Sequence, residues 1–208
     1  MRTLPVNNWN FFYASYKNII PSQFAVAIYP DLRMDDQIIE FGCGNGRDSL
    51  FFLNQGINYF GIDKSEKAIE LIIKDHPNFS ANFSASDILD DDLWFKISNL
   101  KRNSNQRFVF YSRFFQHSIN EEEEIFQIKK ITSFLKSGDL LFFEFRLKKD
   151  KNSFKNFGDH FRRYESSDHF MKKFDKDKYT LIYHYEGRGV AKYLDEDPYV
   201  GRFIFSAL

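Results

Sequence analysis

The stretch Glu40-Phe-Gly-Cys-Gly-Asn-Gly46 decides the fold, because it separates an apolar run that begins at Gln37 from a helical pattern at residues 47–55. Glycines at alternate positions after a strand make a tight turn and let the backbone approach a bound ligand closely. A dinucleotide fingerprint needs its third glycine three residues after Gly44, where Arg47 stands, and the sequence has no P-loop signature. The turn therefore predicts a ligand site that is not built for a pyrophosphate.

Strand and helix patterns alternate along the chain. Apolar runs of strand character lie at residues 37–42, 58–63, 82–87, 107–112 and 139–146, and helical patterns lie at 47–55, 65–74 and 121–135. This order predicts an α/β fold with a mostly parallel sheet, right-handed crossovers and helices on both faces. Four glutamates, Glu121 to Glu124, follow Asn120 and complement the positive end of a helix dipole. We expect them to form a solvated helix start.

The end of the chain departs from this alternation. Residues 160–174 have a helical pattern, and residues 179–185 and 200–205 alternate as strands. A reverse turn around 195–198 would join these strands as an antiparallel hairpin. A length of 208 residues fits one such α/β domain.

Composition argues against several kinds of partner. The 29 Lys and Arg balance the 29 Asp and Glu, so no overall field would attract nucleic acid or an anionic membrane. The one cysteine, Cys43, cannot form an intrachain disulfide or a multi-cysteine zinc site. No apolar run approaches the roughly 20 residues that span a bilayer, and the first residues lack a signal-peptide pattern. We expect a cytoplasmic protein without a metal, and its oligomeric state stays open.

Two acidic residues extend the site around the glycine turn. Asp63 ends the second strand, where its carboxylate can accept hydrogen bonds from both hydroxyls of a ribose, and Asp87 follows the third apolar run. In order and spacing, residues 37–146 resemble the class I S-adenosylmethionine-dependent methyltransferase family, in which an acidic residue precedes a G-x-G-x-G turn and another closes strand two. G-C-G-N-G-R-D-S-L is similar to the tellurite-resistance and thiopurine methyltransferase-like branch. The N-terminal W-x-x-x-Y with P-S-x-F-A looks like small bacterial methyltransferases of polysaccharide pathways.

The resemblance implies a Rossmann-like methyltransferase sheet, S-adenosylmethionine as cofactor and S-adenosylhomocysteine as product. It divides the chain into an N-terminal helical lid (1–36), a cofactor-binding core (37–146), and an acceptor-side insertion with the C-terminal hairpin (147–208). The lid could equally be a hydrophobic helix packed on the sheet. By the same resemblance Glu40 orients the amino-acid part of the cofactor, Asp63 binds its ribose and Asp87 its adenine. The expected cofactor-binding residues are Trp9, Tyr13, Ser22, Glu40, Gly42, Cys43, Gly44, Gly46, Arg47, Asp63, Lys64, Ser86, Asp87, Ile88 and Tyr111.

Residues after strands four and five should face the methyl acceptor, because ligands of open α/β sheets lie beyond the carboxyl ends of the strands. We expect a small-molecule acceptor that carries a carboxylate or phosphate, since arginine makes paired hydrogen bonds to both groups. The candidate substrate-binding residues are Arg113, Arg146, Arg162, Arg163 and Arg188. Each of them could instead be exposed or paired with a nearby carboxylate.

A catalytic base is needed only if the acceptor must lose a proton. His117 and His160 are the candidates, because histidine titrates near neutrality. Cys43 stands inside the glycine turn, where small residues are required, and we interpret it as a packing residue. The sequence does not distinguish O- from N-methylation.

Three other functions stay open at this point. A nicotinamide-dependent oxidoreductase could use a similar sheet, although Arg47 disfavours it. A cofactor-binding subunit without turnover would share the same turn. A nucleic-acid methyltransferase is disfavoured by the neutral charge and by Tyr111-Ser-Arg-Phe114, which replaces an N/D-P-P-Y/F tetrad.

Overall fold

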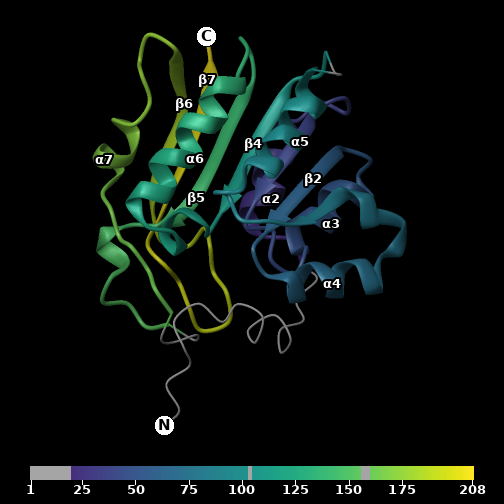
Figure 1. Cartoon of the computed structure of the whole chain (residues 1–208). Coiled ribbons are helices and arrows are strands. Elements are labelled where there is room, and N and C mark those ends of the chain that lie inside the picture. The colour runs from purple at the N-terminus through teal and green to yellow at the C-terminus, as the bar shows by residue number, and fades with distance from the viewer. Residues whose placement is uncertain (1–19, 103–104, 156–159) are drawn as a thin grey trace.

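The computed structural model describes residues 20–102, 105–155 and 160–208, and a seven-stranded sheet forms its centre (Figure 1). The strand order is β3-β2-β1-β4-β5-β7-β6. Strands β1 to β5 pair in parallel, and β7 runs antiparallel to both β5 and β6. The strands are β1 Gln37–Phe41, β2 Asn58–Asp63, β3 Phe83–Ala85, β4 Phe108–Arg113, β5 Leu140–Arg146, β6 Tyr179–Gly187 and β7 Val200–Ala207. The expected mostly parallel sheet with an antiparallel C-terminal hairpin is confirmed.

Helices cover both faces of this sheet, as expected. Helices α5, α6 and α7 pack on one face through Trp94, Ile131 and Phe170. Helices α3 and α4 pack on the other face through Phe52 and Ile72. Figure 1 shows α6 in front of the sheet near β5. The helices are α2 Gln23–Ile28, α3 Arg47–Asn54, α4 Glu66–Asp75, α5 Asp91–Arg102, α6 Glu121–Phe134 and α7 Ser167–Met171, with short 3₁₀ turns η1 Tyr29–Asp31, η2 Pro77–Asn82, η3 Gln116–Ser118 and η4 Lys148–Asp150. No helix in the described ranges is long and apolar enough to cross a membrane.

The local sequence explains where these elements begin. All five residues of β1 are buried, as is usual for a parallel strand that is covered on both faces. The side chain of Ser65 accepts a hydrogen bond from the N–H of Ala68 and so caps α4. Asn120 and Glu123 form a reciprocal capping box at the start of α6. Each cap fixes where the chain leaves a strand-end loop, and these loops build the site.

Two expectations about the C-terminal part are wrong. The pattern at residues 160–174 forms a helix only from Ser167, because Ser166 caps α7 there, and Glu165 pairs instead with Leu147 as an isolated bridge. The strands β6 and β7 are not joined by a simple reverse turn. A tight turn exists between Tyr193 and Glu196, but it lies within a longer connection, residues 188–199. Helix α5 was not anticipated from the sequence.

The glutamates at the start of α6 do not form a uniformly solvated group. Glu124 is fully buried, and it pairs with Arg163 at 2.8 Å and with Lys173. Glu165 joins the same two cations, at 3.2 Å from Arg163 and 2.7 Å from Lys173. The expectation fails for Glu124 because this buried network ties α6 to the segment that precedes α7.

Candidate functional site

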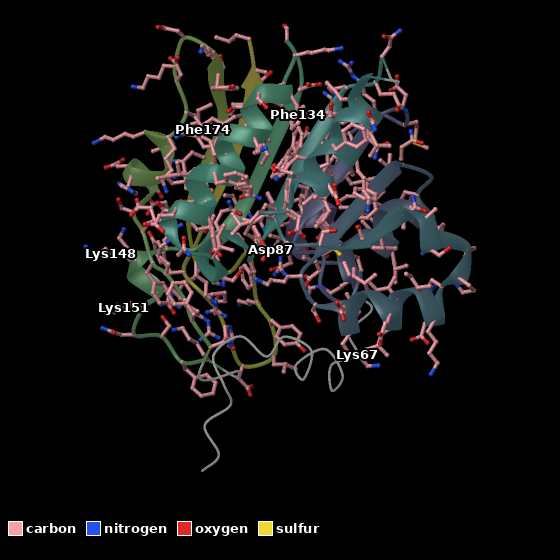
Figure 2. All side chains as sticks on the ribbon, viewed as in Figure 1. Lys67, Asp87, Phe134, Lys148, Lys151 and Phe174 are labelled. Carbon is pink, nitrogen blue, oxygen red and sulfur yellow. The ribbon has the colours of Figure 1, made fainter. Side chains whose placement is uncertain are left out.

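A cavity of about 500 Å³ opens beyond the carboxyl ends of the parallel strands. Figure 2 shows Asp87 at this part of the molecule, while Phe134 and Phe174 lie toward the opposite end of the sheet. One wall comes from the ends of β1 and β2, the start of α3 and the loops after β1, β2 and β3. It consists of Glu40, Gly42, Cys43, Gly44, Asn45, Arg47, Asp48, Ile62, Asp63, Lys64, Ser65, Ser86, Asp87 and Ile88. The other comes from the ends of β4 and β5, from η3 and from later loops, and it includes Arg113, Phe114, Phe115, His117, Arg146, His160, Arg162, Ala191, Tyr193, Glu196 and Pro198.

The glycine turn forms a wall of backbone. Gly42, Gly44 and Gly46 have φ angles of 74°, 56° and 77°, a region that L side chains rarely adopt. A Cβ atom on Gly42 would lie 2.6 Å from the Phe115 ring. Cys43 is buried in this turn, and burial raises the pKa of its thiol well above the usual value. The thiol therefore stays protonated, in line with a packing role.

Asp63 holds the turn in place from the end of β2. One carboxylate oxygen accepts a hydrogen bond from the N–H of Gly44 at 2.8 Å, and the other accepts from the N–H of Ser65 at 2.8 Å. Each oxygen can still accept a second hydrogen bond from a ligand hydroxyl. Farther along this wall, exposed Lys64 pairs with Asp87 at 2.5 Å. These contacts place two acidic side chains along the same side of the cavity.

Glu40 lies beneath the turn at the end of β1, and only 3% of its surface is exposed. One of its oxygens accepts hydrogen bonds from the hydroxyls of Ser49, at 3.0 Å, and of Tyr59. Burial, assisted by the negative charge of Asp48, raises the pKa of Glu40 to about 8. The carboxyl group is therefore mainly protonated at neutral pH.

Asp48 is a cavity residue that the sequence analysis missed. It accepts hydrogen bonds from the N–H and hydroxyl of Ser22, both at 2.7 Å, and from the hydroxyl of Tyr111 at 2.8 Å. Burial would raise the pKa of Asp48, but the charges of Arg113 and Arg47 and the bonds from Ser22 outweigh it and hold the pKa below the usual value. The available signal was an acidic residue in the first turn of the helix that follows the glycines.

Some expected cofactor residues lie away from the cavity wall. Ser22 is buried as the N-cap of α2, and Tyr111 is fully buried and stacks on Phe24. Both side chains point at Asp48 rather than lining the cavity. Gly46 is not among the lining residues either, although it begins α3 beside them. Trp9 and Tyr13 lie outside the described residues.

Phe114 stands at the centre of the later wall in a strained conformation. Its φ is 56°, which is unusual for a residue with a large side chain. The guanidinium groups of Arg113 and Arg146 lie 4.3 and 5.3 Å from its ring centre, and the His117 ring meets it edge-on at 5.4 Å. Strain of this kind persists only where the surroundings impose it, and it often marks a functional site.

The arginines expected to bind the acceptor divide into two groups. Arg113, Arg146 and Arg162 line the cavity, whereas Arg163 and Arg188 do not. Arg113 pairs with buried Glu144 at 2.8 Å, and Arg146 pairs with Asp150 at 2.7 Å and with Glu196. Arg163 contacts the buried Glu124, and Arg188 is exposed and donates to the backbone of Asp197.

Both candidate histidines line the cavity. Burial and the charges of Arg162 and Arg146 lower the pKa of His160 to about 4. The same causes, with burial largest, hold the pKa of His117 well below 6.5. Both imidazoles are therefore neutral at pH 7. Ala191, Tyr193 and Pro198 also line this wall. They could not be predicted, because no pattern in residues 188–199 indicates how that loop folds back.

No protein-family model and no curated protein sequence matches this chain. Solved structures do match it. A SAM-dependent methyltransferase from Anabaena variabilis has a TM-score of 0.68 at 17% identity and covers 96% of this chain and 92% of its own. A TehB-like SAM-dependent methyltransferase from Corynebacterium glutamicum has a TM-score of 0.64 at 16% identity, with 96% and 94% covered. Magnesium protoporphyrin IX methyltransferase from Synechocystis, with bound SAM, has a TM-score of 0.57 at 13% identity, with 86% and 75% covered.

The chain has the class I S-adenosylmethionine-dependent methyltransferase fold. The family resemblance in residues 37–146 is thus confirmed for the fold. In this fold the cavity described above lies at the carboxyl edge of the sheet, where open α/β sheets bind their ligands.

Proposed function

We propose that this chain is a methyltransferase that transfers the methyl group of S-adenosylmethionine to a small molecule. The observation that carries the proposal is the continuity of the cavity. One cavity is lined by the glycine turn and Asp63 at one side and by Phe114, Arg162 and the two histidines at the other. A cofactor held at one side and an acceptor held at the other would therefore meet in the same enclosed space.

The residues of the first wall fit this cofactor. Asp63 can accept hydrogen bonds from ribose hydroxyls, and Asp87, once released from Lys64, from an adenine amino group. Gly42 and Gly44 border the cavity with backbone, and Glu40 supplies a carboxyl group that can ionise opposite a cation. When bound, S-adenosylmethionine supplies a methyl group that is already activated.

The protein then has to position the acceptor and exclude water. Phe114 supplies an apolar surface, which Arg113 and Arg146 clamp in place. Arg162 gives this wall positive charge, which suits an acceptor that carries a carboxylate or a phosphate. Arg146 lines the same wall, and its own charge is shared with Asp150 and Glu196. His160 is the candidate base, since its imidazole is neutral at pH 7. Burial lowers its pKa first and Arg162 second, and an anion near Arg162 would offset the second effect.

The test is methyl transfer from isotope-labelled S-adenosylmethionine to fractionated small-molecule extracts. We expect label in an anionic fraction with the wild-type chain and at least a tenfold loss with Asp63→Ala. Binding of S-adenosylhomocysteine without transfer to any fraction would favour a subunit without turnover. Absence of binding would refute the proposal.

A further inference from the structure

His117 is held at one ring nitrogen by the backbone. The N–H of Arg146, at the end of β5, donates a hydrogen bond to Nδ1 of His117 at 3.3 Å. His117 lies in η3, and its backbone carbonyl accepts a hydrogen bond from the N–H of Arg163 at 2.8 Å. The Phe114 ring packs edge-on against the imidazole. The orientation of the ring is thus fixed from three separate segments.

This bond determines where the proton of the neutral ring resides. A neutral imidazole has one N–H donor and one acceptor nitrogen. Because Nδ1 accepts from Arg146, the proton lies on Nε2. Within the described residues, Nε2 of His117 makes no hydrogen bond to the protein. His117 is only 5% exposed and lines the cavity. Its Nε2–H is therefore the ring group left to contact a ligand there.

The surroundings keep the ring neutral. The charged groups around it are Arg113 on β4, Arg146 on β5, and Arg162 beside His160 on the segment that precedes α7. Burial is the largest cause that disfavours a second proton on His117, and these cations and potential cations add to it. Glu196 lies farther along the same wall and is paired with Arg146.

We propose that His117 donates a hydrogen bond from Nε2 to an oxyanion of the methyl acceptor, a carboxylate or a phosphate, and does not act as the catalytic base. The proposal rests on the proposed function, because it assigns a role within the same cavity. A ring whose basic nitrogen is occupied by a backbone amide has no site for a proton taken from the acceptor. It can instead select acceptors that present an oxygen beside Arg146 and Arg162.

Two substitutions separate the donor from the acceptor nitrogen. His117→Asn keeps an oxygen near the position of Nδ1, for the N–H of Arg146, and loses the donor at the position of Nε2. His117→Gln places an amide N–H near Nε2 and gives up the oxygen near Nδ1. If the donor matters, His117→Asn should weaken binding of the oxyanion about tenfold, and His117→Gln should retain most of it.

The experiment records ¹H–¹⁵N spectra of the full-length chain with ¹⁵N-labelled histidine, with and without S-adenosylhomocysteine, from pH 5.5 to 8. We expect an Nε2-protonated, non-titrating His117 whose Nε2–H signal moves when inorganic phosphate or acetate is added. A response to phosphate alone or acetate alone identifies the preferred oxyanion. Inorganic phosphate binding to the two variants is then compared by the same titration, or acetate if only acetate responds.

A proton on Nδ1, titration near pH 6.5, or a signal that neither anion moves would overturn the proposal. The wild-type spectrum alone decides these points if a variant fails to fold. Failure of S-adenosylhomocysteine to bind would remove the proposed function, whereas the spectrum without it still tests the assignment of His117.

Discussion

Replacing Glu40 with glutamine should remove a large part of the pH dependence of stability. Glu40 is buried, and its pKa is about 8 in the folded chain, against about 4.5 for an ordinary glutamate. Below pH 4.5 the group is protonated in both the folded and the unfolded state. Between pH 4.5 and 8 only the folded state keeps the proton, so the free energy of unfolding falls as the pH rises.

The size of the effect follows from the two pKa values. A difference of about 3.5 units corresponds to about 5 kcal/mol at 1.36 kcal/mol per unit, which is lost progressively up to pH 8. Glutamine is a neutral isostere of the protonated acid, and its oxygen can accept from Ser49 and Tyr59 as Glu40 does. The free energy of unfolding of Glu40→Gln, relative to that of the wild type, should therefore rise by about 1.4 kcal/mol for each pH unit between pH 4.5 and 8.

Urea unfolding of both proteins at pH 5.5, 6.5 and 7.5 measures this difference directly. Titrating groups that do not interact with Glu40 contribute equally to both proteins and cancel. Glu122→Gln, which removes an exposed carboxylate from α6, is the matched control. Its free energy of unfolding should differ from that of the wild type by the same amount at all three pH values. If Glu40→Gln also ran parallel to the wild type, with a constant difference across the three pH values, the assignment of a protonated Glu40 would be refuted.

Further substitutions test the two walls of the cavity. Arg162→Ala should raise the KM for the acceptor about tenfold and leave S-adenosylhomocysteine binding unchanged, because Arg162 lines the cavity. Arg163→Ala should instead lower the free energy of unfolding by about 3 kcal/mol, because it removes one cation from buried Glu124. Enzyme kinetics and urea unfolding distinguish these outcomes, and a KM effect confined to Arg163→Ala would reverse the assignment. Gly42→Ala should weaken S-adenosylhomocysteine binding and cost about 1–3 kcal/mol, because its Cβ would lie 2.6 Å from Phe115 at a φ of 74°. Unchanged calorimetric affinity in that variant would show that the turn does not border the ligand.

The fold could be predicted because its signals are local. Alternating apolar runs and the glycines after β1 indicate parallel strands joined by helices, and the observed strand order agrees. The acidic residues at strand ends could also be predicted, because the sequence pattern indicates where each strand ends. Glu40 and Asp63 both lie in the cavity wall for this reason.

The later wall could not be predicted with the same success, because its geometry depends on contacts distant in sequence. Arg162 and Arg163 are neighbours of the same type, yet Arg162 lines the cavity and Arg163 pairs with the buried Glu124. That difference depends on how the segment before α7 lies against η3. Likewise, Asp48 could be recognised only after Ser22 and Tyr111 were seen to converge on it.

Calorimetric titration of the chain with S-adenosylhomocysteine and, separately, with NAD tests the nature of the cofactor. We expect saturable binding of S-adenosylhomocysteine at one site, at least a tenfold loss of affinity in Asp63→Ala, and no binding of NAD. Binding of NAD without binding of S-adenosylhomocysteine would contradict the assignment of S-adenosylmethionine as the cofactor.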